Sequence, residues 1–387
     1  MDYATLLSRT ARELKPSGIR KFFDLAATME GVISLGVGEP DFKTPYAIRR
    51  AGVESLEKGR TWYTANAGLL ELRRQIAAYL ARRFDLCYDE NQVLVTVGGS
   101  EAIDLCIRAC LDPGDQVLIP EPCFVCYDPI TRLAGGVPVP IVTRPEEGFR
   151  LTPEALEAAI TPRTKVLVLP YPNNPTGAIM KREHLEAIAR VLRQHDILVL
   201  SDEIYAELTF EGRHVSIASL PGMAERTVVV NGFSKAYAMT GWRLGYAAGP
   251  EEVIRVMTKL HQFAIMCAPT TSQYAAIEAM KNCDGEIQRM AVQFGMRRGL
   301  MVSSLNQMGL ACADPLGAFY VFPSIRSTGL GSEEFCERLL REQKVAVVPG
   351  GAFGESGEGH VRISYSYSVD YLIEALRRIQ VFVEGLG

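Results

Sequence analysis

The stretch "RTVVVNGFSK" (residues 226–235) decides the fold, because an unbroken β-branched run ends there in Gly, Ser and Lys. A strand without polar alternation is buried on both faces, which is typical of a parallel sheet covered by helices. Most lysines lie on solvated surfaces. The position of Lys235 at the end of a buried strand therefore raises the question of a chemical role.

Four further apolar runs end in the same way, at Gly, Pro or Asp: 91–98, 115–122, 164–172 and 196–203. Helix-like segments such as 100–111 and 181–196 lie between them. This alternation predicts an α/β fold, with a large domain whose mainly parallel sheet is sandwiched by helices.

The two ends of the chain differ from this pattern. Strand candidates at 317–325 and 360–368 lie among C-terminal helices and predict a smaller α+β domain. We expect three parts: an N-terminal segment that packs on the small domain (1–45), a large domain (46–284) and the small domain (285–387).

Composition narrows the class of protein. The chain has 387 residues, 48% of them hydrophobic and 22% charged, with a net charge of −4, which argues against a nucleic-acid partner. No apolar run is long enough for a membrane span, and the charged N-terminus does not resemble a signal peptide, so we expect a cytoplasmic protein. Cys123 and Cys126 form a CxxC without further metal ligands nearby, and we expect small buried side chains and no metal site.

The residues that follow the apolar runs are the candidate site, because ligands of open α/β sheets bind beyond the carboxyl ends of the strands. An acid, a phenol, an amide and an amine recur at these positions. The candidates are Gly98 to Glu101, Phe124, Asn173 to Gly177, Asp202, Tyr205, Ser234 and Lys235.

Six segments in order and spacing give the chain a family resemblance: "GVGEPDF" (36–42), "YTANAGLLELR" (63–73), "YPNNPTG" (171–177), "SDEIY" (201–205), "FSKAYAMTGWRLGY" (233–246) and "HVRISYS" (360–366). Over essentially its whole length the chain resembles the fold-type-I aminotransferases of class I/II, which depend on pyridoxal 5′-phosphate (PLP). Its N-terminal part resembles the Bacillus-type branch of N-acetyl-diaminopimelate, aromatic and aspartate aminotransferases. The resemblance implies a seven-stranded sheet and a cytoplasmic homodimer with shared active sites.

The resemblance implies roles for four residues around the cofactor ring. Lys235 resembles the lysine that bonds to the PLP aldehyde, and a desolvated position suits its neutral amine. Asp202 would keep the pyridine nitrogen protonated; the alternative for a lone Asp202 is a helix N-cap. Tyr205 and Asn174 would bind the phenolic oxygen, although "NNPTG" also suits a plain turn.

The phosphate needs donors and positive charge. By resemblance, Gly99, Ser100 and Glu101 open a helix whose free N–H groups favour an anion, and Ser234 and Arg243 add a hydroxyl and a guanidinium.

Two aromatic positions complete the cofactor site implied by the resemblance. Tyr63 would reach the phosphate of the neighbouring subunit. Phe124 matches the ring-stacking position, where the family often has Trp or Tyr.

The substrate site is also implied by the resemblance. Arg362 matches the arginine that binds the α-carboxylate, with Asn174 beside it, and Gly38 matches a small residue near the same carboxylate. Ile19 and Arg20 are candidates for the distal end of the substrate; the alternative for Arg20 is an ordinary surface charge.

The resemblance implies ping-pong transfer of an amino group to a 2-oxo acid, with 2-oxoglutarate as the expected acceptor. Of the donors, N-acetyl-L,L-diaminopimelate is favoured, with aromatic amino acids or aspartate as alternatives. A PLP-dependent carbon–sulfur β-lyase would use the same Lys235. A PLP-sensing transcription regulator would need a helix-turn-helix module, and an NAD-type dehydrogenase would need GxGxxG after a strand; we expect neither.

Overall fold

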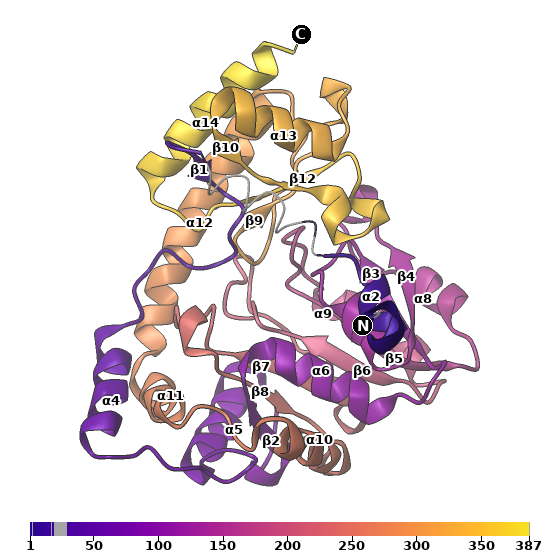
Figure 1. Ribbon diagram of the computed structural model, residues 1–387, viewed down its shortest axis with the longest axis vertical. Coiled ribbons are helices and arrows are strands. Elements are labelled where there is room, and N and C mark those ends of the chain that lie inside the picture. The colour runs from indigo at the N-terminus through magenta and orange to yellow at the C-terminus, as the bar shows by residue number, and fades with distance from the viewer. Residues whose placement is uncertain (2, 17, 19–28, 387) are drawn as a thin grey trace.

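The computed structural model describes residues 1, 3–16, 18 and 29–386. A large domain with a central sheet occupies the lower half of Figure 1, and the C-terminal helices lie above it. None of the helices in these described ranges combines the length and apolar character that a membrane span requires.

The central sheet has seven strands in the order β2-β8-β7-β6-β5-β3-β4. Neighbours from β4 to β7 are parallel, whereas β8 runs antiparallel to both β7 and β2. The strands are β2 (Val93–Thr96), β3 (Gln116–Glu121), β4 (Val137–Val142), β5 (Thr164–Leu169), β6 (Leu198–Asp202), β7 (Thr227–Gly232) and β8 (Gly245–Ala248). The predicted α/β fold with a mainly parallel, seven-stranded sheet is confirmed.

Each central strand is buried on both faces, which explains the unbroken apolar runs. Val228 and Val230 of β7 pack in one core, and Val229 between them packs in another on the opposite face. Because side chains alternate across a strand, two buried faces require an apolar residue at every position. The helices of this domain are α4 (Tyr46–Glu57), α5 (Leu70–Phe84), α6 (Gly98–Cys110), α7 (Tyr127–Leu133), α8 (Pro153–Ala159), α9 (Arg182–Leu192), α10 (Glu251–Ile265) and α11 (Thr270–Asn282).

Two strands of this sheet lie outside the predicted set. β4 has the sequence VPVPIV, and its prolines Pro138 and Pro140 remove backbone donors. Its position at the edge of the sheet, paired only with β3, tolerates that loss. β8, with the sequence GYAA, is too short and too rich in small residues to give a strand pattern.

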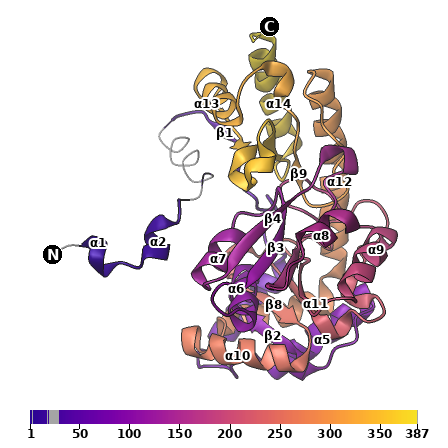
Figure 2. The same cartoon turned by 90° about the vertical axis from the view of Figure 1, so that its right-hand side faces the viewer.

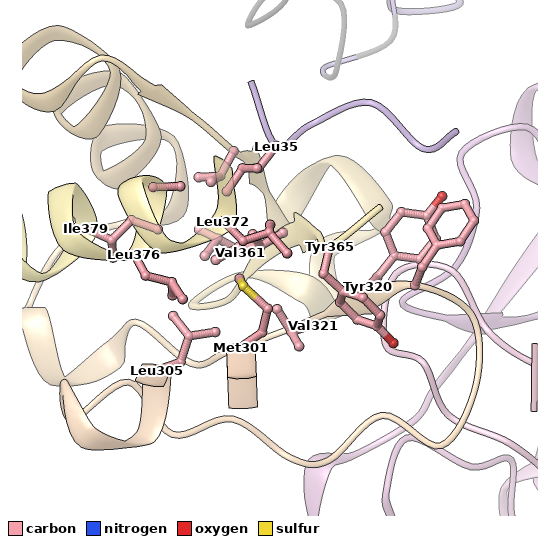
Figure 3. Close-up of a cluster of buried hydrophobic side chains, with 14 of the residues drawn as sticks. Leu35, Met301, Leu305, Tyr320, Val321, Val361, Tyr365, Leu372, Leu376 and Ile379 are labelled. Carbon is pink, nitrogen blue, oxygen red and sulfur yellow. The ribbon is translucent and has the colours of Figure 1, made fainter. Parts of the chain in front are cut away.

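The C-terminal part forms a second core around a three-stranded antiparallel sheet in the order β11-β12-β9. Figure 3 shows Tyr320, Val321, Val361 and Tyr365 of this region packed with leucines and Ile379 of the last helix. β9 is only two residues long, shorter than the predicted run at 317–325. The elements are α12 (Asp284–Gln307), β9 (Tyr320–Val321), α13 (Ser332–Gln343), β10 (Val345–Ala346), β11 (Val348–Pro349), β12 (Val361–Ser364) and α14 (Val369–Glu384).

The N-terminal segment has two kinds of contact. β1 (Ile33–Ser34) pairs in parallel with β10 of the C-terminal part. Helices α1 (Tyr3–Leu6) and α2 (Arg9–Glu13) project to one side of the molecule in Figure 2, and α2 contacts α7. The division at residues 45 and 284 stays our proposal; the β1–β10 pairing supports it, whereas the α2–α7 contact ties the first helices to the large domain.

Candidate active site

A cavity of about 390 Å³ lies beyond the carboxyl ends of β5, β6 and β7, a size suited to a small organic ligand. Eleven predicted residues from distant parts of the chain line it together: Gly38, Gly99, Ser100, Phe124, Asn174, Asp202, Tyr205, Ser234, Lys235, Arg243 and Arg362.

Lys235 is half-buried and donates a hydrogen bond from Nζ to the carbonyl oxygen of Gly38. Burial lowers the pKa of its amine from 10.5 to about 8; Glu39 opposes this shift, and Arg362 and Arg243 reinforce it. A measurable fraction of the amine is therefore neutral near pH 7, as a nucleophile or base requires.

Asp202 is the last residue of β6 and is buried. Its Oδ2 accepts a hydrogen bond from Tyr127 at 2.7 Å and its Oδ1 accepts one from the backbone N–H of Ile204 at 3.2 Å. Burial raises the pKa of this carboxyl, and the two hydrogen bonds act against that shift. The acid therefore depends on its donors to stay ionised.

Arg362 in β12 is buried. Among the described residues, no carboxylate forms an ion pair with it. Nη1 donates to Asn174 Oδ1 at 3.0 Å and Nη2 donates to the carbonyl oxygen of Gly36. Among the described residues Nε finds no hydrogen-bond partner. The guanidinium lies 4.6 Å from the ring centroid of Tyr320 and 4.9 Å from that of Phe353. A buried guanidinium that lines a cavity and has no carboxylate partner among the described residues suits an anionic ligand.

Two tyrosines and a glycine connect the opposite walls of the cavity. The hydroxyls of Tyr205 and Tyr320 are 2.8 Å apart. A Cβ on Gly38 would lie 2.2 Å from the Tyr320 hydroxyl oxygen, so only glycine allows this approach. Tyr320 was not a candidate from the sequence, where it was only part of a strand pattern.

The start of α6 lies against Arg243, an arrangement that suits an anion. Gly98 has φ of +77°, and a Cβ there would lie 2.6 Å from Arg243 Nη2. Free N–H groups of a helix start and a guanidinium thus face the same space, which Ser100 and Ser234 also line.

These groups fit PLP. The lining has an amine of lowered pKa, an acid held by two donors, a phenol and an amide, and Arg243 lies against Gly98 where any larger residue would intrude. The guanidinium of Arg362, which lines the cavity, suits a substrate carboxylate.

Of the residues given a role in the site from the sequence, Glu101 and Tyr63 are described and are absent from the cavity lining. The carboxylate of Glu101 accepts from the N–H of Val97 and lies 2.9 Å from His261 Nδ1, which directs it away from the cavity. Tyr63 is 76% exposed on the surface of this chain. Ile19 and Arg20 lie outside the described residues.

Among the lining residues that the sequence left without a role, three have titratable side chains. They are Glu39, Tyr127 and Tyr320. Glu39 lies within the quoted "GVGEPDF" segment, whose spacing could have marked it. Tyr127 follows the CxxC, and no pattern there pointed to a partner 75 residues away.

The CxxC itself flanks the cavity residue Phe124. Cys123 is buried and Cys126 is half-buried, and both are free thiols. Burial raises the pKa of both thiols, which keeps them protonated and unreactive.

Comparison with known sequences gives a family match. Residues 30–379 match the model of the family described as aminotransferase class I and II. A putative aminotransferase, YugH, from Bacillus subtilis is 55% identical over 97% of this chain and 98% of its own. An aromatic-amino-acid aminotransferase from Thermococcus litoralis is 45% identical over 97% of both chains. A probable N-acetyl-LL-diaminopimelate aminotransferase from B. subtilis is 44% identical over 98% of this chain and 96% of its own.

Solved structures agree with this match. The aspartate aminotransferase from Thermus thermophilus with maleate superimposes with a TM-score of 0.93 at 41% identity, over 97% of this chain and 99% of that one.

Proposed function

Because the chain belongs to the class I and II aminotransferase family and is thus a PLP-dependent aminotransferase, we propose that the cavity described above is its catalytic site. We infer ping-pong transfer of an amino group from an amino acid to a 2-oxo acid, with 2-oxoglutarate as the acceptor.

The proposed cofactor residues act as follows. When bound, PLP supplies a ring that accepts the electron pair left as the substrate Cα loses its proton. Before substrate binds, Lys235 would hold the cofactor covalently; once the substrate's amine has displaced it, the freed Nζ would take the Cα proton and pass it back to the cofactor. Asp202 keeps the ring nitrogen protonated, and Tyr205 and Asn174 bind the phenolic oxygen.

The other cofactor contacts orient and anchor the ring. Phe124 stacks on one face. Gly99, Ser100, Ser234 and Arg243 bind the phosphate. Glu101 accepts the Val97 N–H through its carboxylate at the start of α6, where the free backbone N–H groups would face the phosphate.

One observation carries the proposal: the buried guanidinium of Arg362 and a lysine with pKa near 8 line the same small cavity. A guanidinium binds a carboxylate through two parallel hydrogen bonds, which places the amino acid's Cα over the lysine. Arg362 would therefore hold the substrate's carboxylate next to the Cα atom from which Lys235 removes a proton.

The lining favours an aromatic amino donor. Of the described residues that line the cavity, three are cations, and each has a role: Lys235, Arg243 and Arg362. No further cation belongs to the described lining, so the distal carboxylate of 2-oxoglutarate is left to a residue outside it, for which Arg20 is the candidate, while Val37, Phe124, Ile204 and Tyr320 offer apolar contact to an aromatic side chain. The relative named an aromatic-amino-acid aminotransferase supports this choice. The N-acetyl-diaminopimelate donor favoured from the sequence has a relative of similar identity and stays the second candidate.

We also propose a homodimer. Trp62, Tyr63 and Phe263 are 63%, 76% and 83% exposed, which is unusual for large rings on a monomer. A second copy covering these rings would bring Tyr63 to the phosphate of the other site.

A panel of amino donors with 2-oxoglutarate, scored by kcat/KM, tests the function. We expect aromatic donors to exceed N-acetyl-L,L-diaminopimelate and aspartate. A preference for either of the latter would contradict the donor assignment. Ammonia release without any 2-oxo acid would instead indicate a β-lyase and contradict transamination.

A further inference from the structure

The contact between Tyr127 and Asp202 has no part in the function proposed so far. Tyr127 is the first residue of α7, its side chain is 1% exposed, and it lines the cavity. Its hydroxyl donates to Asp202 Oδ2 at 2.7 Å, while the N–H of Ile204 donates to Oδ1 at 3.2 Å. Each oxygen of the acid is therefore held by its own donor.

We propose that Tyr127 is a positioning residue that keeps Asp202 ionised and correctly oriented, so that the shared proton stays on the cofactor's ring nitrogen. This inference rests on the proposed role of Asp202. Tyr127 acts through the acid.

The proton between an acid and a pyridine nitrogen has two possible positions. On the nitrogen it makes an ion pair, and on the carboxyl it leaves two neutral groups. A hydrogen bond to the carboxylate stabilises the ionised form, so a donor at Oδ2 shifts the proton toward the nitrogen. Only the protonated ring is an effective electron acceptor.

The surroundings of Asp202 make this donor necessary. Burial and the neighbouring Glu203 raise the pKa of the acid, whereas Tyr127, the Ile204 N–H and Lys235 lower it. The other titratable groups that face the acid are Cys126 and Tyr205, both of which keep their protons because burial raises their pKa. Tyr127 supplies the shorter of the two hydrogen bonds.

Tyr127 is suited to act as a permanent donor. Burial and the charge of Asp202 raise the pKa of its hydroxyl, so it remains protonated. Its ring meets the ring of Phe124 edge-on, with centroids 6.1 Å apart. That packing fixes the hydroxyl's direction and links the acid to the residue proposed to stack on the cofactor.

A second buried tyrosine makes the same bond away from the cavity and provides a matched control. Tyr79 in α5 donates to Glu207, which is also paired with Arg83. Tyr79 and Glu207 are absent from the described cavity lining. Tyr79→Phe removes a buried tyrosine–carboxylate bond without touching the site.

The test compares holoenzymes loaded with PLP labelled with ¹⁵N in the ring, whose NMR shift reports protonation. We expect Tyr127→Phe to move the signal toward that of a neutral ring and to lower kcat roughly tenfold to hundredfold, the effect of a hydrogen bond to a charged group. KM should change little. Tyr79→Phe should leave the ¹⁵N signal and kcat as in the wild type.

Asp202→Asn separates the two proposals. If it leaves the ring protonated and kcat unchanged, the role of Asp202 is wrong. If it neutralises the ring and slows the reaction while Tyr127→Phe matches the wild type, only the inference on Tyr127 is overturned. Unfolding midpoints of the two Tyr→Phe variants show whether a loss of kcat merely follows a loss of stability.

Discussion

The two walls of the cavity are built in different ways. On the large-domain wall, Asn174, Asp202 and Lys235 lie at or just beyond the ends of neighbouring strands in one hydrogen-bonded sheet. On the opposite wall, Gly38, Tyr320 and Arg362 come from a loop and two short strands. The first wall carries the proposed cofactor chemistry, and the second carries the proposed substrate contacts.

Hydrogen bonds join these walls. Lys235 Nζ donates to Gly38, Tyr205 pairs with Tyr320, and Arg362 donates to Asn174. The comparison teaches that a continuous sheet places the reactive groups, while separate segments shape the pocket for the substrate. Substitutions on the two walls should therefore differ in what they damage.

The largest effect is expected on the large-domain wall. Lys235→Ala should lower kcat at least about 10³-fold, because it removes both the covalent attachment and the base. PLP should still bind, but weakly and reversibly, as measured by dialysis and absorbance. Lys281→Ala, at a surface pair with Glu71, is the control and should keep wild-type kcat. Turnover retained by Lys235→Ala would contradict the assignment.

The next effect belongs to the opposite wall. Arg362→Lys should raise KM for the amino donor roughly tenfold to hundredfold, because an ammonium cannot replace a two-pronged contact with a carboxylate. The visible spectrum of the bound cofactor should not change. Loss of cofactor with an unchanged KM would contradict the assignment of substrate contacts to this wall and of cofactor chemistry to the other.

A smaller effect is expected where the walls meet. Gly38→Ala places a Cβ 2.2 Å from the Tyr320 hydroxyl oxygen and should cost about 1–3 kcal/mol in the free energy of unfolding. Denaturant melts measure this loss. Gly299→Ala in α12, where a Cβ would meet no atom within 4 Å, should instead be neutral or stabilising. Equal stability of Gly38→Ala and wild type would contradict the close approach.

The smallest effect concerns Arg20, outside the described residues. Arg20→Ala should raise KM about twofold to fivefold for dicarboxylic substrates, the range of an exposed ion pair. Aromatic donors should be unaffected. Unchanged kinetics with 2-oxoglutarate would remove Arg20 from the substrate site.

Sequence reasoning reached the large-domain wall more completely than the opposite wall. Apolar runs mark buried strands, and the residues after them converge because parallel strands end at one edge; Asp202 and Lys235 follow from that rule. Arg362 and Gly38 were reached only through the family resemblance.

Contacts between distant segments left no local signal. The Tyr127–Asp202 and Tyr205–Tyr320 pairs join residues 75 and 115 positions apart. The sequence next to each residue therefore does not indicate its partner. β4 was missed because its prolines are compatible with a strand only at a sheet edge, a position that depends on the topology.

The most direct test of the account is the rate at which cofactor-free enzyme attaches PLP, followed in the visible and trapped with borohydride, as a function of pH. Because only the neutral amine reacts, the rate should rise with pH through a midpoint near 8, and peptide mapping should place the label on Lys235. A label elsewhere, or a midpoint near the ordinary lysine value of 10.5, would contradict the account.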